Sequence, residues 1–329
     1  MKVGLLAGGR SGEHAISLVT AEAVREALLS LGHEVLVLTL GQHDGAEWSG
    51  ASGSVGEGLA ELQSWCPDVA FIAMHGSLGE DGCIQGALEI LNIPYQGADV
   101  AASAVAMDKD LCKRMYRLAN LPVADDMVLS PPGDGVAWDE VATTVGLPLV
   151  LKTAHSGSSV GVEMVDTLER LAIRGPALLL EGRPVVAEGW LPGREFTCSV
   201  LEDVDGTPRA LPLIEIQVKD AGFFDYATKY DPNAVDEICP APVDEELGRE
   251  MTALALRAHR VLGCRDYSRT DFMLDAQGQP RLLETNTLPG LTPASLFPLA
   301  ASRAGMAFSA LVERLVLCAA TRRPTGSPP

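Results

Sequence analysis

The chain has 329 residues, of which 47% are hydrophobic and 21% are charged. This composition excludes a disordered chain, and the length predicts two or three domains with clefts between them. The 44 acidic and 25 basic residues give a net charge of -19, which repels nucleic acid and anionic membranes. We therefore expect neither as a partner, and a bound anion would need local positive charge.

The cysteine pattern favours a reduced compartment. The seven cysteines are scattered, odd in number and free of any Cys-x-x-Cys pair, so they predict neither a disulfide framework nor a zinc site. The first residues form only a short apolar stretch broken by glycine, and no apolar run approaches the roughly 20 residues of a membrane span. We expect a cytoplasmic protein.

Residues 1–97 are predicted to form a doubly wound α/β domain with a parallel sheet. Hydrophobic runs indicate its strands, and helical spacing indicates the helices between them. The predicted strands are 3–6, 34–40 and 68–74, and the predicted helices are 15–31 and 83–91.

Two α+β domains are predicted to follow, over residues 98–187 and 188–329. The first contains a helix with Lys109 and a strand over 147–152 that runs into a Gly/Ser-rich loop at 155–161. In the second, the expected elements are strands 195–201 and 210–218, a polar segment over 219–240, a helix over 244–262 and a hairpin over 268–287.

The hairpin carries a cluster of oxygen ligands. Its turn is predicted to centre between Gln277 and Gly278, so that Asp271 faces Glu284 across the two strands. Asn286 follows Glu284 on the same face because strand side chains alternate. Opposed carboxylates are destabilising without a cation between them, and hard oxygen donors suit Mg²⁺. We predict a Mg-nucleotide site, although the ligands alone also suit other metals, and chance acids on a solvated strand pair are the alternative.

A lysine beside a Gly/Ser loop supplies the positive charge that a phosphate needs. Lys152 ends a predicted strand, and the loop after it contains Ser158, Ser159 and Gly161. Exposed backbone N–H groups in such a loop form a concavity that cradles phosphate. Lys109 is a second candidate, although a single lysine on a helix is usually just solvated.

The first turn after the N-terminal strand resembles a dinucleotide-binding fingerprint that lacks one glycine. Two features argue against an NAD-dependent enzyme. Glu13 would put a carboxylate where the pyrophosphate binds, and the second strand ends at Leu40 without the acid that binds ribose. Glu13 would otherwise only stabilise the helix dipole.

Three blocks in and after the hairpin, 271–275, 283–287 and 288–292, resemble the signature of the D-alanine–D-alanine ligase family. Similar blocks recur along almost the whole chain. The resemblance implies an ATP-grasp fold and the ATP-dependent ligation of two D-alanine molecules through an acyl phosphate, for peptidoglycan precursors. It also implies a homodimer.

The resemblance assigns residues to ATP and its metal ions. Asp271, Glu284 and Asn286 would hold two Mg²⁺ ions, or Mn²⁺ in their place, that bridge the ATP phosphates. Gly189 departs from the lysine that many relatives carry there, so one contact with adenine is lost or made by the backbone. The ATP contacts that the resemblance implies are Lys109, Lys152, Ser159, Glu188, Trp190, Leu191, Glu195, Phe223, Met273 and Leu283.

The resemblance also assigns residues to the amino-acid substrates. Glu13 and His75 would contact the first D-alanine, and the Arg269 guanidinium with the Gly290 N–H would stabilise the charge that appears in the tetrahedral state. A single histidine is usually structural, but His75 stands in a His-Gly-x-x-Gly-Glu-Asp-Gly block. The remaining assignments are Ser295 and Leu296 for the second substrate's carboxylate, Lys229 and Tyr230 in a lid, and Ser158 in a hydrogen-bonded set with Tyr230 and Glu13.

Two alternatives stay open at this point. Tyr230 favours an amine as the second substrate, but a ligase that uses D-serine or D-lactate is not excluded by the sequence. A regulator that binds ATP without turnover is the other alternative, and the complete metal set together with Arg269 speaks against it. The D configuration of the substrates rests on the resemblance alone.

Overall fold

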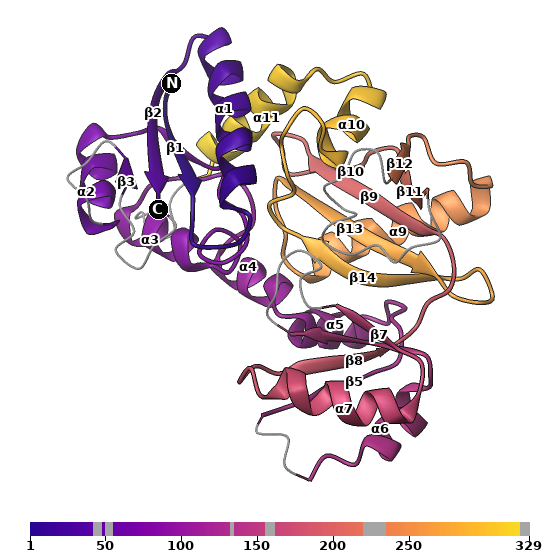
Figure 1. Cartoon of the computed structure of the whole chain (residues 1–329). Coiled ribbons are helices and arrows are strands. Elements are labelled where there is room, and N and C mark those ends of the chain that lie inside the picture. The colour runs from indigo at the N-terminus through magenta and orange to yellow at the C-terminus, as the bar shows by residue number, and fades with distance from the viewer. Residues whose placement is uncertain (42–47, 50–54, 132–134, 155–161, 220–234, 323–329) are drawn as a thin grey trace.

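The structure, a computed structural model, describes residues 1–41, 48–49, 55–131, 135–154, 162–219 and 235–322. It contains three sheets (Figure 1). The N-terminal sheet lies beside the six-stranded sheet that contains β13 and β14. The second four-stranded sheet, with β5 and β8, lies on another side of that six-stranded sheet.

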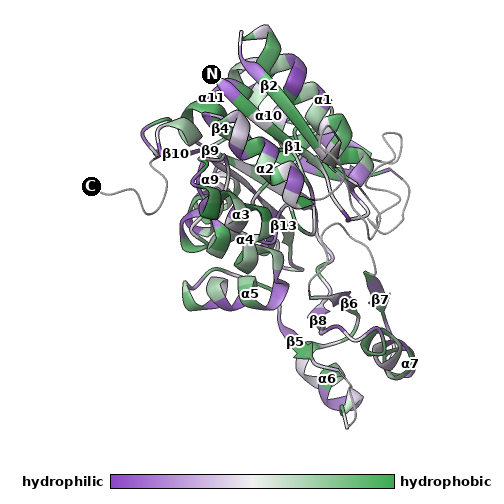
Figure 2. Cartoon of the chain, turned by 90° about the vertical axis from the view of Figure 1, so that its left-hand side faces the viewer, coloured by the Kyte–Doolittle hydropathy of each residue, from purple (hydrophilic) through white to green (hydrophobic). Residues whose placement is uncertain are grey.

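The N-terminal sheet has the order β3-β2-β1-β4, and β1 pairs in parallel with both β2 and β4. The predicted parallel sheet is therefore confirmed. Its strands are hydrophobic, whereas the helices around them carry both kinds of residue (Figure 2). Its elements are β1 (Lys2–Gly8), α1 (His14–Ser30), β2 (Glu34–Leu40), β3 (Trp48–Ser49), α2 (Val55–Trp65), β4 (Val69–Ile72) and α3 (Cys83–Leu91).

The second sheet has the order β5-β8-β6-β7 and is antiparallel throughout. Two helices, α6 and α7, pack their leucines and valines against it in a core of its own. The elements of this unit are β5 (Asp126–Leu129), α6 (Trp138–Val145), β6 (Leu149–Thr153), β7 (Glu163–Val165), α7 (Leu168–Leu179) and β8 (Val185–Gly189).

The third sheet has the order β12-β11-β9-β13-β14, with β10 paired to β9. The single strand predicted over 210–218 was wrong, because β10 and β11 are separate strands that both pair with β9. The elements are α4 (Val100–Met107), α5 (Lys109–Leu118), β9 (Glu195–Glu202), β10 (Pro208–Ala210), β11 (Ile214–Val218), β12 (Val235–Ile238), α9 (Glu245–Val261), β13 (Tyr267–Leu274), β14 (Pro280–Asn286), α10 (Leu296–Arg303) and α11 (Phe308–Ala320).

Two helices pack against a sheet other than that of their predicted domain. Buried residues of α5 share a core with β9, β13 and α9, and α11 packs on α1 and β4 of the N-terminal domain. The mixture of an α/β unit with α+β units agrees with the predicted fold class. The predicted domain limits 1–97, 98–187 and 188–329 stay a prediction, and β8 runs two residues past 187.

The predicted hairpin register holds for the first half of β13 and fails for the second. Asp271 pairs with Glu284 and Arg269 with Asn286, as expected. A β-bulge then follows, so Phe272 pairs with Leu282 and the turn centres on Gln277 rather than between 277 and 278. Such a bulge inserts one unpaired residue on one strand, which the alternation of polar and apolar residues does not reveal.

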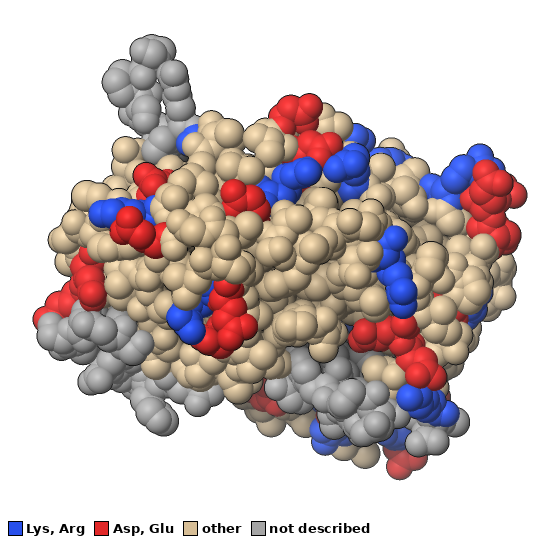
Figure 3. Space-filling view, turned by 90° about the horizontal axis from the view of Figure 1, so that it is seen from above, with Lys and Arg blue, Asp and Glu red and all other residues tan. Residues whose placement is uncertain are grey.

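On one face of the molecule, charge is locally compensated. On the face in Figure 3, acidic and basic side chains form small mixed groups separated by uncharged surface, although the net charge is -19. None of the helices in the described ranges has the length and apolar character that crossing a membrane requires.

A polar joint connects the N-terminal sheet to the third sheet. The Gln96 side chain accepts a hydrogen bond from the Ile72 N–H at 2.8 Å and donates to the Ile72 carbonyl at 2.9 Å. It also donates to the Tyr267 hydroxyl at 3.3 Å. Next to it, the Gly97 N–H donates to the buried Asp266 carboxylate at 2.7 Å. This joint fixes the edge strand β4 against β13.

Replacing Gln96 with Leu should destabilise the protein by about 2–5 kcal/mol, because the buried N–H and C=O of Ile72 both lose their partner. Urea denaturation followed by circular dichroism measures this. The exposed Gln277, replaced in the same way, serves as the control and should change the free energy of unfolding by less than about 0.5 kcal/mol. Equal effects of both substitutions would show that the hydrogen bonds of Gln96 do not stabilise the folded protein.

Candidate active site

The candidate site is a pocket of about 1080 Å³ whose walls come from strands of the second and third sheets, from the start of α1 and from the segment after β4. Every predicted site residue that the structure describes lines it. These residues are Glu13, His75, Lys109, Lys152, Glu188, Trp190, Leu191, Glu195, Arg269, Asp271, Met273, Leu283, Glu284, Asn286, Gly290, Ser295 and Leu296. The other predicted residues, Ser158, Ser159, Phe223, Lys229 and Tyr230, lie outside the described residues.

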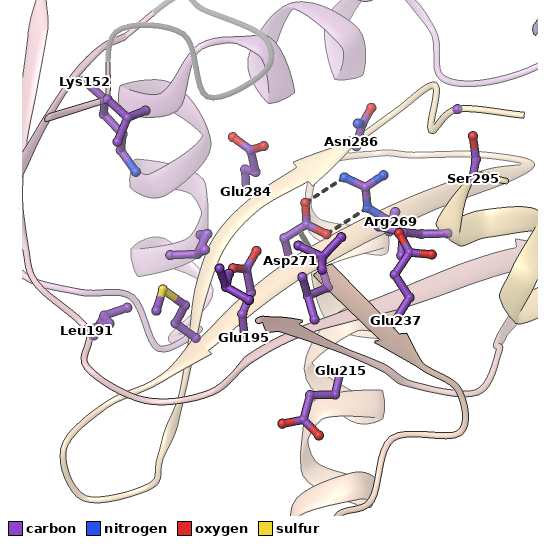
Figure 4. Close-up of a pocket in the computed structure, with 18 of the residues that line it drawn as sticks. Lys152, Leu191, Glu195, Glu215, Glu237, Arg269, Asp271, Glu284, Asn286 and Ser295 are labelled. Carbon is purple, nitrogen blue, oxygen red and sulfur yellow. Dashed lines mark hydrogen bonds and ion pairs between the residues drawn. The ribbon is translucent and has the colours of Figure 1, made fainter. Parts of the chain in front are cut away.

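The hairpin places its polar side chains in one part of this pocket (Figure 4). The Arg269 guanidinium donates two hydrogen bonds to the Asp271 carboxylate, each 2.8 Å long. The Thr197 hydroxyl donates a third to Asp271, at 2.7 Å. Burial alone would lower the pKa of Arg269, but the charge of Asp271 outweighs it and raises the pKa. Arg269 is therefore a fixed, permanently charged group.

The predicted metal-ligand set combines two carboxylates and an amide. Asp271 and Glu284 are directly opposite in the sheet, and the Glu284 Oε2 lies 3.3 Å from the Lys109 Nζ. No cluster of three or more His, Cys, Asp or Glu residues that could hold a metal occurs in the described ranges. The oxygen donors of Asp271, Glu284 and Asn286 nevertheless fit Mg²⁺, because this ion commonly takes one or two carboxylates and completes its shell with phosphate and water.

Lys152 belongs to a buried charge cluster rather than standing alone at the pocket wall. Its Nζ lies 2.9 Å from the Glu188 Oε2, and the same oxygen accepts a hydrogen bond from the Lys113 ammonium. Glu188 is only 4% exposed. Burial would raise its pKa, but Lys113 and Lys152 together outweigh burial and lower the pKa to about 2. Glu188 is therefore ionised at neutral pH.

The N-terminal wall of the pocket holds the predicted first-substrate residues. Glu13 caps α1 without a side-chain capping bond, and a Cβ on Gly76 would lie only 3.0 Å from its Oε2. Gly76 has φ +66, so glycine is required there for two reasons. The His75 Nε2 is 3.1 Å from the Thr20 hydroxyl, and its Nδ1 is 3.7 Å from Glu80. These contacts fix the imidazole at the pocket wall.

Another part of the wall is the start of a helix. Ser295 is the N-cap of α10, and its hydroxyl accepts a hydrogen bond from the Thr292 N–H at 3.1 Å. Leu296 is the first residue of that helix. Backbone N–H groups and the helix dipole favour an anionic group at such a position. A Cβ on Gly290 would lie 3.0 Å from the Ser295 hydroxyl oxygen, so glycine leaves room there.

Sequence reasoning missed several charged residues at or behind the pocket, among them Arg194 and Glu215, which form an ion pair with each other. Glu80 lines the pocket and accepts a hydrogen bond from the Gly76 N–H at 2.9 Å, and its position in the block after His75 was an available signal. Glu237 lines it from β12, and nothing in the sequence pattern marks this residue. Lys113 was detectable only as the residue four positions after Lys109 on the same helix face.

An antiparallel sheet with an acidic hairpin, facing a smaller sheet that carries a lysine across a common pocket, defines an ATP-grasp ligase. The family model described as "D-ala D-ala ligase C-terminus" matches residues 116–317, and "D-ala D-ala ligase N-terminus" matches residues 49–98. The chain belongs to the D-alanine–D-alanine ligase family.

Relatives and solved structures resemble the chain over nearly its full length. The D-alanine–D-alanine ligase of Desulfotalea psychrophila is 42% identical and aligns with 96% of this chain and 94% of its own. The crystal structure of the Bacillus anthracis ligase complexed with ATP has a TM-score of 0.80 and 30% identity, covering 97% of both chains. That of the Coxiella burnetii ligase has a TM-score of 0.81 and 26% identity, covering 98% of this chain and 94% of the other.

Glu188 should make stability depend on pH in the acid range. Its pKa of about 2 lies below the unperturbed 4.5, so the stability it contributes is fully present above pH 4.5 and is lost as the pH falls towards 2. The difference in free energy of unfolding between the wild type and Glu188→Gln should shrink by about 1 kcal/mol between pH 7 and pH 4. Chemical denaturation at both pH values measures it.

The exposed Glu250, replaced with Gln, is the matched control, and its difference from the wild type should not change with pH. A Glu188→Gln difference that stays constant from pH 7 to pH 4 would mean that Glu188 is not held ionised by the two lysines.

Proposed function

We propose that this chain joins two D-alanine molecules to D-alanyl-D-alanine, with ATP converted to ADP and phosphate through an acyl phosphate. The product is a precursor of peptidoglycan. The observation that carries this proposal is the single pocket in which Arg269, the oxygen ligands of the hairpin and the helix start at Ser295 come together. Relatives named D-alanine–D-alanine ligase, about as long as this chain, support it.

The phosphates of ATP are proposed to lie between the hairpin and the lysines. Lys109 and Lys152 approach the pocket from α5 and β6, and Asp271, Glu284 and Asn286 lie on the hairpin. Two Mg²⁺ ions, replaceable by Mn²⁺, would be held by these three hairpin residues and would supply charge neutralisation for phosphoryl transfer. The lysines provide the positive field that an acidic protein needs to bind an anion.

The adenine and ribose are proposed to occupy the pocket next to residues 190–194, the segment between β8 and β9 that joins the β5-β8-β6-β7 sheet to the third sheet. Glu188 and Glu195 provide acceptors, and the apolar side chains of Trp190, Leu191, Met273 and Leu283 line this part. Phe223 and Ser159 complete the proposed ATP contacts. Gly189 lacks the side chain of the lysine that the family resemblance implies at this position, so one contact with adenine is lost or made by the backbone.

The first D-alanine is proposed to lie against the N-terminal wall, with Glu13 at its ammonium group and His75 beside it. Its carboxylate attacks the γ-phosphate of ATP, which gives the acyl phosphate and ADP. Because a carboxylate of the substrate is the nucleophile, no protein nucleophile is required. Ser158, Lys229 and Tyr230 are proposed to close over this step and exclude water, which would otherwise hydrolyse the acyl phosphate.

The second D-alanine is proposed to bind with its carboxylate at Ser295 and Leu296. Its amine attacks the carbonyl of the acyl phosphate, an oxyanion forms, and phosphate leaves as the peptide bond is completed. The Arg269 guanidinium and the Gly290 N–H stabilise that oxyanion. Because Asp271 already fixes Arg269 through two hydrogen bonds, little reorganisation is needed at the moment of reaction.

We also propose that the chain is a cytoplasmic homodimer, as its resemblance to the family implies. All seven cysteines are free, which is consistent with a reduced compartment. Light scattering of the purified protein measures its mass and tests the dimer.

Purified protein should release phosphate from Mg-ATP with D-alanine as the sole amino acid, and the dipeptide should be identified by mass. Glu284→Gln should reduce kcat by at least about 100-fold, because it removes one charge from the centre of phosphoryl transfer. The exposed Glu250→Gln should leave kcat unchanged. Phosphate release only when D-serine or D-lactate is added would identify that compound as the second substrate. No phosphate release under any condition would favour a regulator that binds ATP without turnover.

The rate of phosphate release should depend on a divalent cation that is bound at Asp271 of the hairpin. Removing divalent cations with EDTA should abolish phosphate release, and Mg²⁺ or Mn²⁺ should restore it. Asp271→Asn should raise the Mg²⁺ concentration for half-maximal rate by at least about tenfold. Asp275→Asn is the control from the same hairpin, since that carboxylate binds Arg281 and the turn instead. Equal effects of the two substitutions would contradict the metal site.

A further inference from the structure

Lys113 is fully buried, although lysine is among the residues least often found inside a protein. It lies in the second turn of α5, on the side of the helix that also carries Cys112 and Tyr116 into the core of the third sheet. Burying an ammonium group costs free energy unless the group is paired. A lysine at such a position therefore needs a reason that packing does not supply.

The partners of Lys113 come from strands of the neighbouring sheet. Its Nζ donates to the Glu188 Oε2 on β8 and lies 3.9 Å from the Asp126 Oδ1 on β5. Lys152 on β6 approaches the same Glu188 oxygen at 2.9 Å. Asp126 is in turn paired with Arg117, one turn further along α5. One carboxylate oxygen thus lies between two ammonium groups.

Only part of this cluster reaches the pocket. Glu188 and Lys152 line it, whereas Lys113, Asp126 and Arg117 are not among the lining residues. Lys113 therefore contacts Glu188 from behind, on the side away from a bound ligand. It cannot touch a nucleotide in the pocket, so any effect on the ligand must pass through its neighbours.

The charges of the cluster explain what Lys113 adds. Asp126 and Arg117 cancel each other, and Glu188 alone would cancel Lys152 as a tight pair. With Lys113 present, the cluster of these five residues carries a net charge of about +1. Because the rest of the chain is strongly acidic, this charge is what faces an anionic ligand at Lys152.

We propose that Lys113 is a positioning residue for nucleotide binding: it holds Glu188 from behind, so that Lys152 remains an effective cation for the nucleotide phosphates. This inference rests on the proposed function, which places those phosphates at Lys152. It assigns Lys113 no contact with substrate and no step in the reaction. Its effect is expected in affinity for the nucleotide rather than in the rate of the chemical steps.

The cluster makes this contribution depend on pH. Burial lowers the pKa of Lys113 to about 8, although Glu188 works in the opposite direction. The charged groups that face it are Glu188 from β8, Lys152 from β6, Asp126 from β5 and Arg117 from α5. Above pH 8 Lys113 loses its proton, Glu188 is left to Lys152 alone, and the positive charge of the cluster disappears. Nucleotide affinity should therefore fall as the pH rises from 7 to 9.

The experiment compares Mg-ADP binding to the full chain by calorimetry at pH 7 and pH 9. The wild type should bind Mg-ADP at least about fivefold more weakly at pH 9, because the cluster beside the phosphates has then lost one positive charge. Lys113→Arg should lose this pH dependence, because a guanidinium stays charged at both pH values. Lys113→Met should bind at pH 7 about as weakly as the wild type does at pH 9. In steady state it should raise KM for ATP more than it lowers kcat.

Lys2→Met is the matched control, since Lys2 is the first residue of β1, does not line the pocket, and contacts Trp65. It should bind Mg-ADP as the wild type does at both pH values. Circular dichroism checks that each variant is folded, and if Lys113→Met is not, Lys113→Arg decides alone. A Lys113→Arg variant that loses affinity at pH 9 in parallel with the wild type overturns the inference. A wild type that binds no Mg-ADP at either pH overturns the proposed function itself.

Discussion

The repulsion between two opposed carboxylates, Asp271 and Glu284, is the constraint around which the pocket is built. Antiparallel pairing puts them on adjacent strands with no residue between them, and like charges in that position are destabilising. Arg269 compensates one carboxylate and Lys109 the other. Arg269 lies on the hairpin itself, whereas Lys109 comes from α5, so the second ion pair ties α5 to the hairpin.

Much of this site could be predicted because strand geometry is local. The alternation of side chains put Glu284 and Asn286 on one face, and the predicted pairing of Asp271 with Glu284 holds because the bulge offsets the displaced turn. The bulge after Asp271 could not be predicted, since it depends on how β13 fits between β9 and β14. The packing of α11 against α1 was also hidden, because an apolar helix face does not specify which other element covers it.

Lys113 shows why burial of a charged residue is the hardest property to predict from sequence. Its neighbours in the chain are ordinary helix formers, and its partners Glu188 and Asp126 come from strands that are distant in sequence. The prediction for Glu188 considered only what it offers to a ligand. In the structure the same carboxylate also binds two lysines, so its role towards the pocket depends on the groups behind it.

The ion pairs at the hairpin and the cluster around Glu188 are two different arrangements of charge beside the same pocket. A chain with a net charge of -19 must present positive charge to an anionic ligand without losing stability to unpaired buried cations. At the hairpin the side-chain cations are matched one to one with carboxylates, so the two pairs together carry no net charge. At Glu188 one carboxylate serves two lysines, which leaves an excess of positive charge in the folded protein before any ligand binds. The polar joint through Gln96 and Asp266 fixes the N-terminal sheet against β13, the strand that carries Arg269. Glu13 at the start of α1 and His75 after β4 belong to the domain held in this way, so the joint sets how the N-terminal wall meets the two charge clusters.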